Sequence, residues 1–192
     1  GKTNRLFESF KALLGKSGWD KYVNLVLHGH TNLNAKIRYM SGIASSELIL
    51  NADGSIYHLK LKPEHIADNV LLVGDPGRVA RISAHFDAVE AKIANREFVT
   101  HVGVYKGMRI TVIGTGIGTD NIDIVLNELD ALVNVDLATR SIKPHHTSLN
   151  LVRMGTSGAL HADIPVDSMV ISKRAIGLDG VLHFYHASHV LN

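Results

Sequence analysis

The sequence predicts an α/β domain, and two observations lead to this prediction. From Ser46 onward, short apolar runs typical of buried strands alternate with segments of helical periodicity. Three of the apolar runs end in glycine-rich loops, and in α/β sheets ligands bind beyond the carboxyl ends of the strands. The composition agrees, because 192 residues with 45% apolar and 20% charged side chains are typical of one globular domain. Collagen-like and disordered classes are excluded.

The first expected elements lead to the first glycine-rich loop. Residues Ile56 to Leu61 alternate as a strand does, and Pro63-Glu64 opens a short helix with proline in its first turn. The continuous apolar run from Val70 to Val73 predicts a strand buried on both faces. The first loop, Gly74 to Arg78, follows this strand. A helix is then predicted by the spacing of Val79, Ile82, Ala84 and Phe86.

The second loop follows a predicted hairpin. Residues Phe98 to Tyr105 and Met108 to Ile113 are expected to pair across a tight turn at Lys106-Gly107. The second of these strands runs directly into the loop Gly114 to Gly118. A long helix is predicted after it by the helical spacing of Ile122, Val125, Leu126, Leu129 and Leu132.

The third loop follows another strand. Residues Leu149 to Met154 are expected to form this strand, which ends in the loop Gly155 to Gly158. Residues Val166 to Ser172 predict one last strand. No internal repeat or low-complexity stretch interrupts this order of elements.

The three loops indicate an anion site, and phosphate is the anion that we expect. Glycines let the backbone approach a ligand closely, and free N–H groups in such loops favour negative charge. Arg78 closes the first loop, Arg153 stands just before the third, and Arg96 lies at the start of a strand. The guanidinium groups of all three suit phosphate oxygens. Taken singly, each loop also fits a plain connection and each arginine a surface or ion-paired side chain. Asp75 and Asp179 stand beside glycine or proline, a context that favours turn formation over general acid catalysis.

The first forty residues differ in charge from the rest of the chain. They hold seven Lys/Arg against Glu8 and Asp20, whereas the other 152 residues hold 13 Lys/Arg against 16 Asp/Glu. We therefore expect an extension without a functional role at residues 1–40 and the domain at residues 41–192. The chain lacks cysteine, which excludes disulfides and thiolate metal sites. With no apolar run long enough to cross a bilayer, we expect a cytoplasmic protein that binds neither membranes nor nucleic acid.

Six segments together resemble the nucleoside phosphorylase family, and within it the uridine phosphorylase branch. The resemblance covers about Ser46 to Phe184. The matching segments, in chain order, are Tyr57-His58-Leu59, Gly74 to Val79, Arg96 to Thr100, Gly114 to Gly118 with Glu128-Leu129, Arg153 to Ala159, and Leu178-Asp179-Gly180 with His183-Phe184. Six matches in the family's order and spacing are specific to it.

The resemblance implies a single three-layer domain around a mixed β-sheet, and phosphorolysis of a nucleoside. It assigns phosphate binding to Gly74, Arg78, Arg96, Arg153 and Thr156, with Arg78, Arg153 and Thr156 as catalytic residues. Ribose and base binding are assigned to His58, Thr156, Ser157 and Gly158. In the neighbouring subunit's site, His58 would contact the ribose 5′-hydroxyl and Arg96 the phosphate, which implies a homodimer or a hexamer built as a trimer of dimers. Orthophosphate is a co-substrate, and the family needs no cofactor.

Two departures from the family pattern limit what the resemblance implies. Asp120-Asn121 stands where many members have Pro-Ser, so a monovalent-cation site does not carry over. The sequence ends at Asn192 without the Gln/Arg pair that reads uracil or the Glu-Met-Glu segment that holds the ribose hydroxyls, so we expect a domain truncated at its C-terminus. Uridine is the expected substrate on branch resemblance. A purine nucleoside phosphorylase, a nucleosidase and an inactive nucleoside- or phosphate-binding fragment are the alternatives.

A metal site is not expected, although the chain has 12 histidines. His183, His186 and His189 are spaced by three residues. On a helix, the first two would lie together while the third would turn partly away. Zinc requires three or four ligands with supporting contacts, and this spacing does not supply them.

Overall fold

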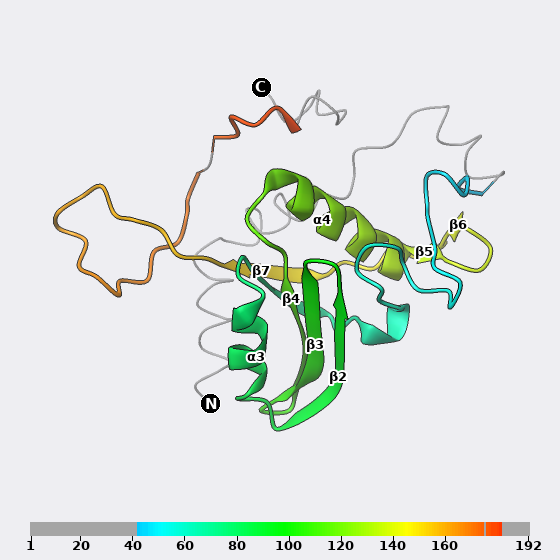
Figure 1. The fold of residues 1–192 in the computed structure, drawn as a ribbon, viewed down its shortest axis with the longest axis horizontal. Coiled ribbons are helices and arrows are strands. Elements are labelled where there is room, and N and C mark those ends of the chain that lie inside the picture. The colour runs from blue at the N-terminus through cyan, green and yellow to red at the C-terminus, as the bar shows by residue number, and fades with distance from the viewer. Residues whose placement is uncertain (1–41, 175, 182–192) are drawn as a thin grey trace.

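The computed structural model describes residues 42–174 and 176–181, and its centre is a mixed five-stranded sheet (Figure 1). The strands lie in the order β2-β3-β4-β1-β7. β1 is parallel to both β4 and β7, whereas β3 is antiparallel to β2 and β4. Their bounds are β1 Asn69–Val73, β2 Ala88–Asn95, β3 Phe98–Tyr105, β4 Met108–Gly114 and β7 Asn150–Met154. The predicted extension at residues 1–40 lies outside the described residues.

Helices cover both faces of the sheet, as the three-layer prediction requires. Successive side chains of a strand point to opposite faces. In β1, Val73 packs with Val79 of α3 (Gly77–Ser83), whereas Leu72 packs in a larger cluster with Leu129 of α4 (Thr119–Asn134). Both predicted helices are therefore confirmed, and the short predicted helix is the 3-10 helix η1 (Pro63–His65). No helix of the described part has both the length and the apolar character to cross a membrane.

The predicted hairpin is confirmed, and a strand that the sequence did not predict lies beside it. The turn between β3 and β4 has positive φ at Lys106 (50°) and Gly107 (77°), as a type I′ turn requires. β2 pairs with β3 along its whole length. It has the alternating pattern Val89, Ala91, Ile93, but small and charged residues between them weaken that signal. The turn Arg96-Glu97 joins β2 to β3, so Arg96 precedes a strand as predicted.

The prediction of a strand at residues Ile56 to Leu61 is wrong. The segment is a turn in which the Ile56 N–H donates to Leu61 O and the Lys60 N–H donates to Ile56 O. Ile56, Leu59 and Leu61 are all buried in the cluster beneath α4, so the apolar positions do not alternate between two faces of a sheet. Lys60 has φ of 55°, which closes the turn.

The prediction of a strand at residues Val166 to Ser172 is also wrong. A strand needs a neighbour for its backbone N–H and C=O groups, and none pairs with this segment in the described part of the chain. Val166 and Met169 are 91% and 79% exposed. The segment continues from the third loop beyond the end of β7, where it is drawn in orange (Figure 1). Another short pair, β5 (Val135–Asp136) with β6 (Ser141–Ile142), follows α4.

Candidate functional site

The sheet topology brings all three glycine-rich loops to one edge. Val73, the last residue of β1, pairs with Gly114 at the end of β4 and with Met154 at the end of β7. Because these strands are parallel, the loops that follow them start side by side. Antiparallel β3 begins at the same edge, since its Val99 also pairs with Gly114. The turn that carries Arg96 therefore lies at this edge too.

Four of the predicted phosphate-binding residues lie together at this edge. Arg78 donates from Nη2 to Thr156 Oγ1 over 3.3 Å. A Cβ atom added at Gly74 would lie 3.4 Å from Arg153 Nη2, so the second guanidinium reaches across the first loop. We call Gly74, Arg78, Arg153 and Thr156 the arginine cluster. Two guanidinium groups and a hydroxyl close together suit a tetrahedral anion with several oxygen acceptors.

Backbone packing fixes the loops that carry the arginine cluster. Thr115 is fully buried, and its N–H donates to Val73 O over 2.8 Å, which ties the second loop to the end of β1. A Cβ atom added at Gly114 would lie only 2.8 Å from Pro76 Cα, so the first loop crosses directly over β4. This approach requires a residue without a side chain at position 114.

The two aspartates that the sequence assigned to turns have that role. The Gly77 N–H donates to Asp75 Oδ1 over 2.9 Å, and the Val181 N–H donates to Asp179 Oδ1 over 2.8 Å. Each is an Asx-turn, in which the carboxylate accepts from the backbone two residues ahead. Asp75 thus shapes the loop that leads into α3 and places Arg78.

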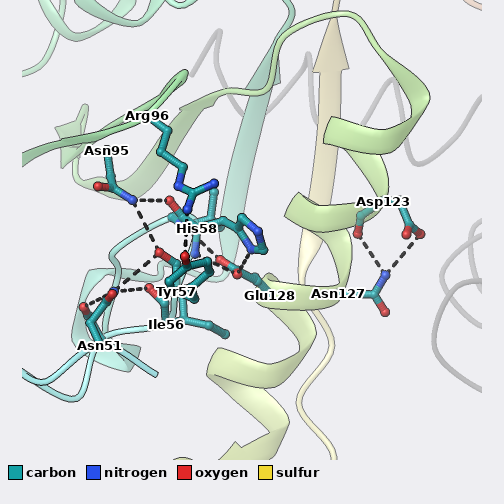
Figure 2. A network of polar contacts seen from close by, with 11 residues as sticks. Asn51, Ile56, Tyr57, His58, Asn95, Arg96, Asp123, Asn127 and Glu128 are labelled. Atoms are coloured by element: carbon teal, nitrogen blue, oxygen red, sulfur yellow. Dashed lines mark hydrogen bonds and ion pairs between the residues drawn. The ribbon is translucent and has the colours of Figure 1, made fainter. Parts of the chain in front are cut away.

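A second group of side chains surrounds His58 (Figure 2). The carboxylate of Glu128, on α4, lies 2.7 Å from His58 Nδ1 through Oε1. The same carboxylate accepts the backbone N–H of His58 at 2.9 Å and that of Leu59 at 2.8 Å. Glu128 therefore fixes both the imidazole and the turn that carries it, across 70 residues of sequence.

The β2–β3 turn contacts the same group (Figure 2). Asn95 Nδ2 donates to His58 O over 2.8 Å. Arg96 Nη2 donates to the Tyr57 hydroxyl over 2.8 Å, and its guanidinium carbon lies 4.8 Å from the centre of the Tyr57 ring. Arg96 has φ of 53°, so the turn aims its side chain towards this group. We call Tyr57, His58, Asn95, Arg96 and Glu128 the His58 network.

The predicted site residues thus fall into two groups at this edge of the sheet. Within residues 42–174 and 176–181, no hydrogen bond or ion pair joins the arginine cluster to the His58 network. Ser157 and Gly158, predicted for ribose and base, follow Thr156 as exposed residues of the third loop. Arg96 therefore contacts the predicted ribose-binding His58 group rather than the other predicted phosphate-binding residues.

Three members of the His58 network received no individual role from the sequence: Tyr57, Asn95 and Glu128. Tyr57 stood in a matched segment only as part of the pattern. Asn95 ends β2, the strand that was not predicted, and the alternation of Val89, Ala91 and Ile93 is the signal that could have located it. Glu128 belongs to one of the segments that resemble the family, but the resemblance assigned it no role of its own. The three histidines considered for metal binding lie outside the described residues. In the part that the structure covers, no three His, Asp or Glu side chains are arranged to hold a metal ion.

Comparison with known proteins connects this edge of the sheet to one family. The sequence model of the phosphorylase superfamily matches residues 68–190, well over half of the chain. The chain belongs to the phosphorylase superfamily. The matched region includes β1, β4 and β7 and the three loops that follow them. The predicted relationship to the nucleoside phosphorylases is therefore confirmed.

Phosphorylase-superfamily relatives of both base classes are similar to this chain. A uridine phosphorylase of Thermococcus kodakarensis is 35% identical over 141 residues, which cover 73% of this chain and 46% of that protein. A DeoD-type purine nucleoside phosphorylase of Streptococcus suis is 36% identical over 120 residues, which cover 62% of this chain and 45% of that protein. The chain spans less than half the length of these relatives.

Solved structures confirm the fold of this phosphorylase-superfamily chain. A Trypanosoma brucei nucleoside phosphorylase that shows uridine phosphorylase activity has a TM-score of 0.56 and 37% identity, covering 62% of this chain and 41% of that one. A uridine phosphorylase of Phytophthora capsici has a TM-score of 0.53 and 27% identity, covering 65% and 39%. The expected three-layer α/β architecture with a mixed sheet is therefore confirmed.

Proposed function

We propose that this chain supplies the phosphate-binding part of a nucleoside phosphorylase that acts on uridine. The observation that carries the proposal is the arginine cluster, in which Arg78 contacts Thr156 while Arg153 reaches Gly74 across the first loop. The uridine phosphorylases among the relatives support uridine as the nucleoside. The purine nucleoside phosphorylase that is 36% identical supports purine nucleosides as the second candidate.

In the proposed reaction, an oxygen of orthophosphate attacks C1′ of the nucleoside. The bond between C1′ and the base nitrogen breaks, and its electron pair leaves with the base, which takes up a proton. The products are ribose 1-phosphate and uracil. Cleavage of a glycosidic bond passes through a state with positive charge on the sugar, and a phosphate dianion held beneath the ring stabilises that charge.

The arginine cluster would hold and aim this phosphate. Arg78, Arg153 and the backbone at Gly74 would bind its oxygens, and Thr156 would contact both phosphate and ribose. Holding the nucleophile against C1′ replaces a bimolecular encounter with a nearly unimolecular step, which lowers barriers by up to about 7–11 kcal/mol in favourable systems. Ser157 and Gly158 would line the ribose and base beside Thr156. No step requires a metal or an organic cofactor.

His58 and Arg96 would complete the site of a neighbouring subunit. Their contacts lie within the His58 network, and no hydrogen bond or ion pair joins that network to the arginine cluster in the described residues. Supplied from a second copy of the chain, His58 would face the ribose and Arg96 the phosphate. The proposed active unit is therefore a homodimer or a hexamer assembled as a trimer of dimers.

The proposal is tested by incubating the chain with uridine, with and without orthophosphate, and measuring uracil and ribose 1-phosphate. Phosphate-dependent formation of both products is the expected result. A faster reaction with inosine would make purine nucleosides the substrate. Release of the base without phosphate would indicate a nucleosidase instead. Phosphate binding without turnover would indicate a binding fragment.

Replacing Arg153 tests the arginine cluster directly. In Arg153→Ala we expect phosphate-dependent turnover to fall by about 10²- to 10³-fold, the usual loss when one donor to a developing charge is removed. Arg81→Ala is the matched control, because Arg81 is an exposed arginine on α3, three residues after Arg78. Phosphate titration by calorimetry measures the binding step alone. An unchanged rate in Arg153→Ala would refute the assigned role.

A further inference from the structure

Glu128 concentrates its contacts on a single turn. Its side chain is 12% exposed and accepts hydrogen bonds from the backbone N–H groups of His58 and Leu59. Its Oε1 also lies 2.7 Å from His58 Nδ1. The turn that receives these contacts buries Ile56, Leu59 and Leu61, so burial and hydrogen bonds together hold the backbone of His58 against α4. Glu128 therefore contacts both the backbone and the imidazole of the same residue.

This contact determines which nitrogen of the imidazole carries the proton. An ionised carboxylate only accepts hydrogen bonds, so Nδ1 must be the donor in its contact with Oε1. In the neutral ring, Nε2 is then an acceptor on the opposite side. The other tautomer would place the Nδ1 lone pair against a negatively charged oxygen. The His58 side chain is 30% exposed, so a ligand has access to the ring.

Asn95 secures the other side of the same residue. Its Nδ2 donates to His58 O over 2.8 Å, while Glu128 holds the His58 N–H. Both backbone polar groups of His58 are thus held by side chains from β2 and α4. The backbone of His58 is consequently held by the fold, and the contact with Glu128 Oε1 orients the imidazole.

We propose that Glu128 is a positioning residue that holds His58 as the Nδ1–H tautomer, so that Nε2 accepts a hydrogen bond from the ribose 5′-hydroxyl of the nucleoside. The inference rests on the proposed function, because it takes the nucleoside as the ligand of His58. It adds the direction of the hydrogen bond and the residue that sets it. Glu128 thereby favours nucleosides whose 5′ position carries a hydrogen-bond donor.

The tautomer can be measured without any turnover. In the full chain with ¹⁵N-labelled histidine, two-bond and three-bond ¹H–¹⁵N spectra distinguish Nδ1–H from Nε2–H rings, and His58→Ala assigns the signal. We expect the Nδ1–H pattern for His58 in the unmodified chain. Glu128→Leu should convert it to the Nε2–H pattern, because leucine offers no acceptor to Nδ1–H. Glu128→Ala should convert it as well, because free imidazole favours Nε2–H.

The control for this measurement is Glu90→Gln. Glu90 lies on β2 and forms an ion pair with Arg109 over 2.8 Å. This pair is near the end of β2 that is far from Arg96 and the His58 network, so the substitution should leave the His58 signal unchanged. Circular dichroism checks that each variant is folded, and Glu128→Leu keeps a side chain of similar size if Glu128→Ala does not fold. An Nε2–H ring in the unmodified chain, or the same tautomer in a folded Glu128 variant, would overturn the proposal.

A second measurement compares uridine with 5′-deoxyuridine. Loss of an oriented acceptor should lower kcat/KM for uridine by about tenfold in Glu128→Ala, the value of one neutral hydrogen bond. The value for 5′-deoxyuridine should stay unchanged, because this substrate has no hydroxyl to donate. Equal losses for the two substrates would show a merely structural role. If neither substrate turns over, the proposed function fails and the tautomer measurement alone decides the role of Glu128.

Discussion

The arginine cluster and the His58 network lie at one edge of the sheet, but different parts of the chain hold them in place. In the arginine cluster, backbone packing fixes the loops while the side chains stay accessible, and Arg78 and Thr156 share a hydrogen bond of 3.3 Å. In the His58 network, the Glu128 side chain itself fixes the backbone of a turn. The difference separates accessible side chains on fixed loops from side chains that are themselves held by hydrogen bonds.

This difference has a physical reason. A tetrahedral dianion offers oxygens in several directions, so guanidinium groups can approach it in more than one geometry. An imidazole that recognises a single hydroxyl must present one nitrogen with the correct protonation. The first task requires backbone that comes close to the ligand, and the second requires a side chain held from behind.

The largest effect on stability is expected where backbone packing holds the arginine cluster. In Gly114→Ala, the new Cβ would lie 2.8 Å from Pro76 Cα and 3.3 Å from Val79 Cγ2, so the first loop or α3 must shift. We expect the free energy of unfolding to fall by about 3 kcal/mol, typical of overpacking at a tight site. Urea denaturation measures it.

Gly158→Ala is the matched control for stability. Nothing lies within 4 Å of a Cβ atom at Gly158, so its urea midpoint should not change. If Gly114→Ala is as stable as the unmodified chain, the first loop is not fixed by its approach to β4. The contrast between the two clusters would then weaken.

A smaller loss of stability is expected in the His58 network. Glu128→Ala removes the acceptor of two backbone N–H groups, one of which belongs to the buried residue Leu59. Leaving such a donor unsatisfied costs about 1–3 kcal/mol, so we expect the free energy of unfolding to fall by about 2 kcal/mol. Arg78→Ala should cost less than about 0.5 kcal/mol, because the contacts that it loses, with Thr156 and Asp75, are accessible to solvent.

These two variants sharpen the contrast between the clusters. Urea denaturation of both, under the same conditions, gives the comparison directly. Equal losses would contradict it, because the arginine cluster would then contribute to stability through its side chains as well. A negligible loss in Glu128→Ala would show that other contacts hold the turn.

The sequence predicts the arginine cluster well because its signals are local. Each glycine-rich loop directly follows an apolar run, and parallel pairing brings the ends of β1, β4 and β7 together. An arginine close to such a loop is therefore placed with few assumptions. The relative order of the strands did not need to be known.

The His58 network could not be predicted in the same way. Its central contact joins residues 70 apart, and no local pattern indicates that Glu128 reaches the turn at His58. The apolar positions Ile56, Leu59 and Leu61 predict a strand, whereas all three pack in the same cluster beneath α4. In Val166 to Ser172 the apolar pattern was present, but pairing partners decide whether a strand forms, and local sequence does not encode them.

The smallest expected effect concerns the face of the sheet that supports Arg78. His101 of β3 is buried against α3, where its Nδ1 lies 2.7 Å from Ser83 Oγ. Burial lowers the pKa of His101, and the positive charge of Lys92, the residue of β2 that pairs with His101, lowers it further. The unfolded chain therefore binds a proton at His101 more readily than the folded chain does.

The pH dependence of stability follows from this sign. The contribution of neutral His101 is fully present above its ordinary pKa of about 6.5 and is lost as the pH falls through its lowered value in the folded chain. Between pH 7.5 and 5.5, we expect the unmodified chain to lose more stability than His101→Gln, whose side chain does not titrate. Urea denaturation at both pH values measures this difference, which should be smaller than the loss in Glu128→Ala. Equal pH dependence in the two proteins would show that protonation of His101 does not loosen α3, the helix that carries Arg78.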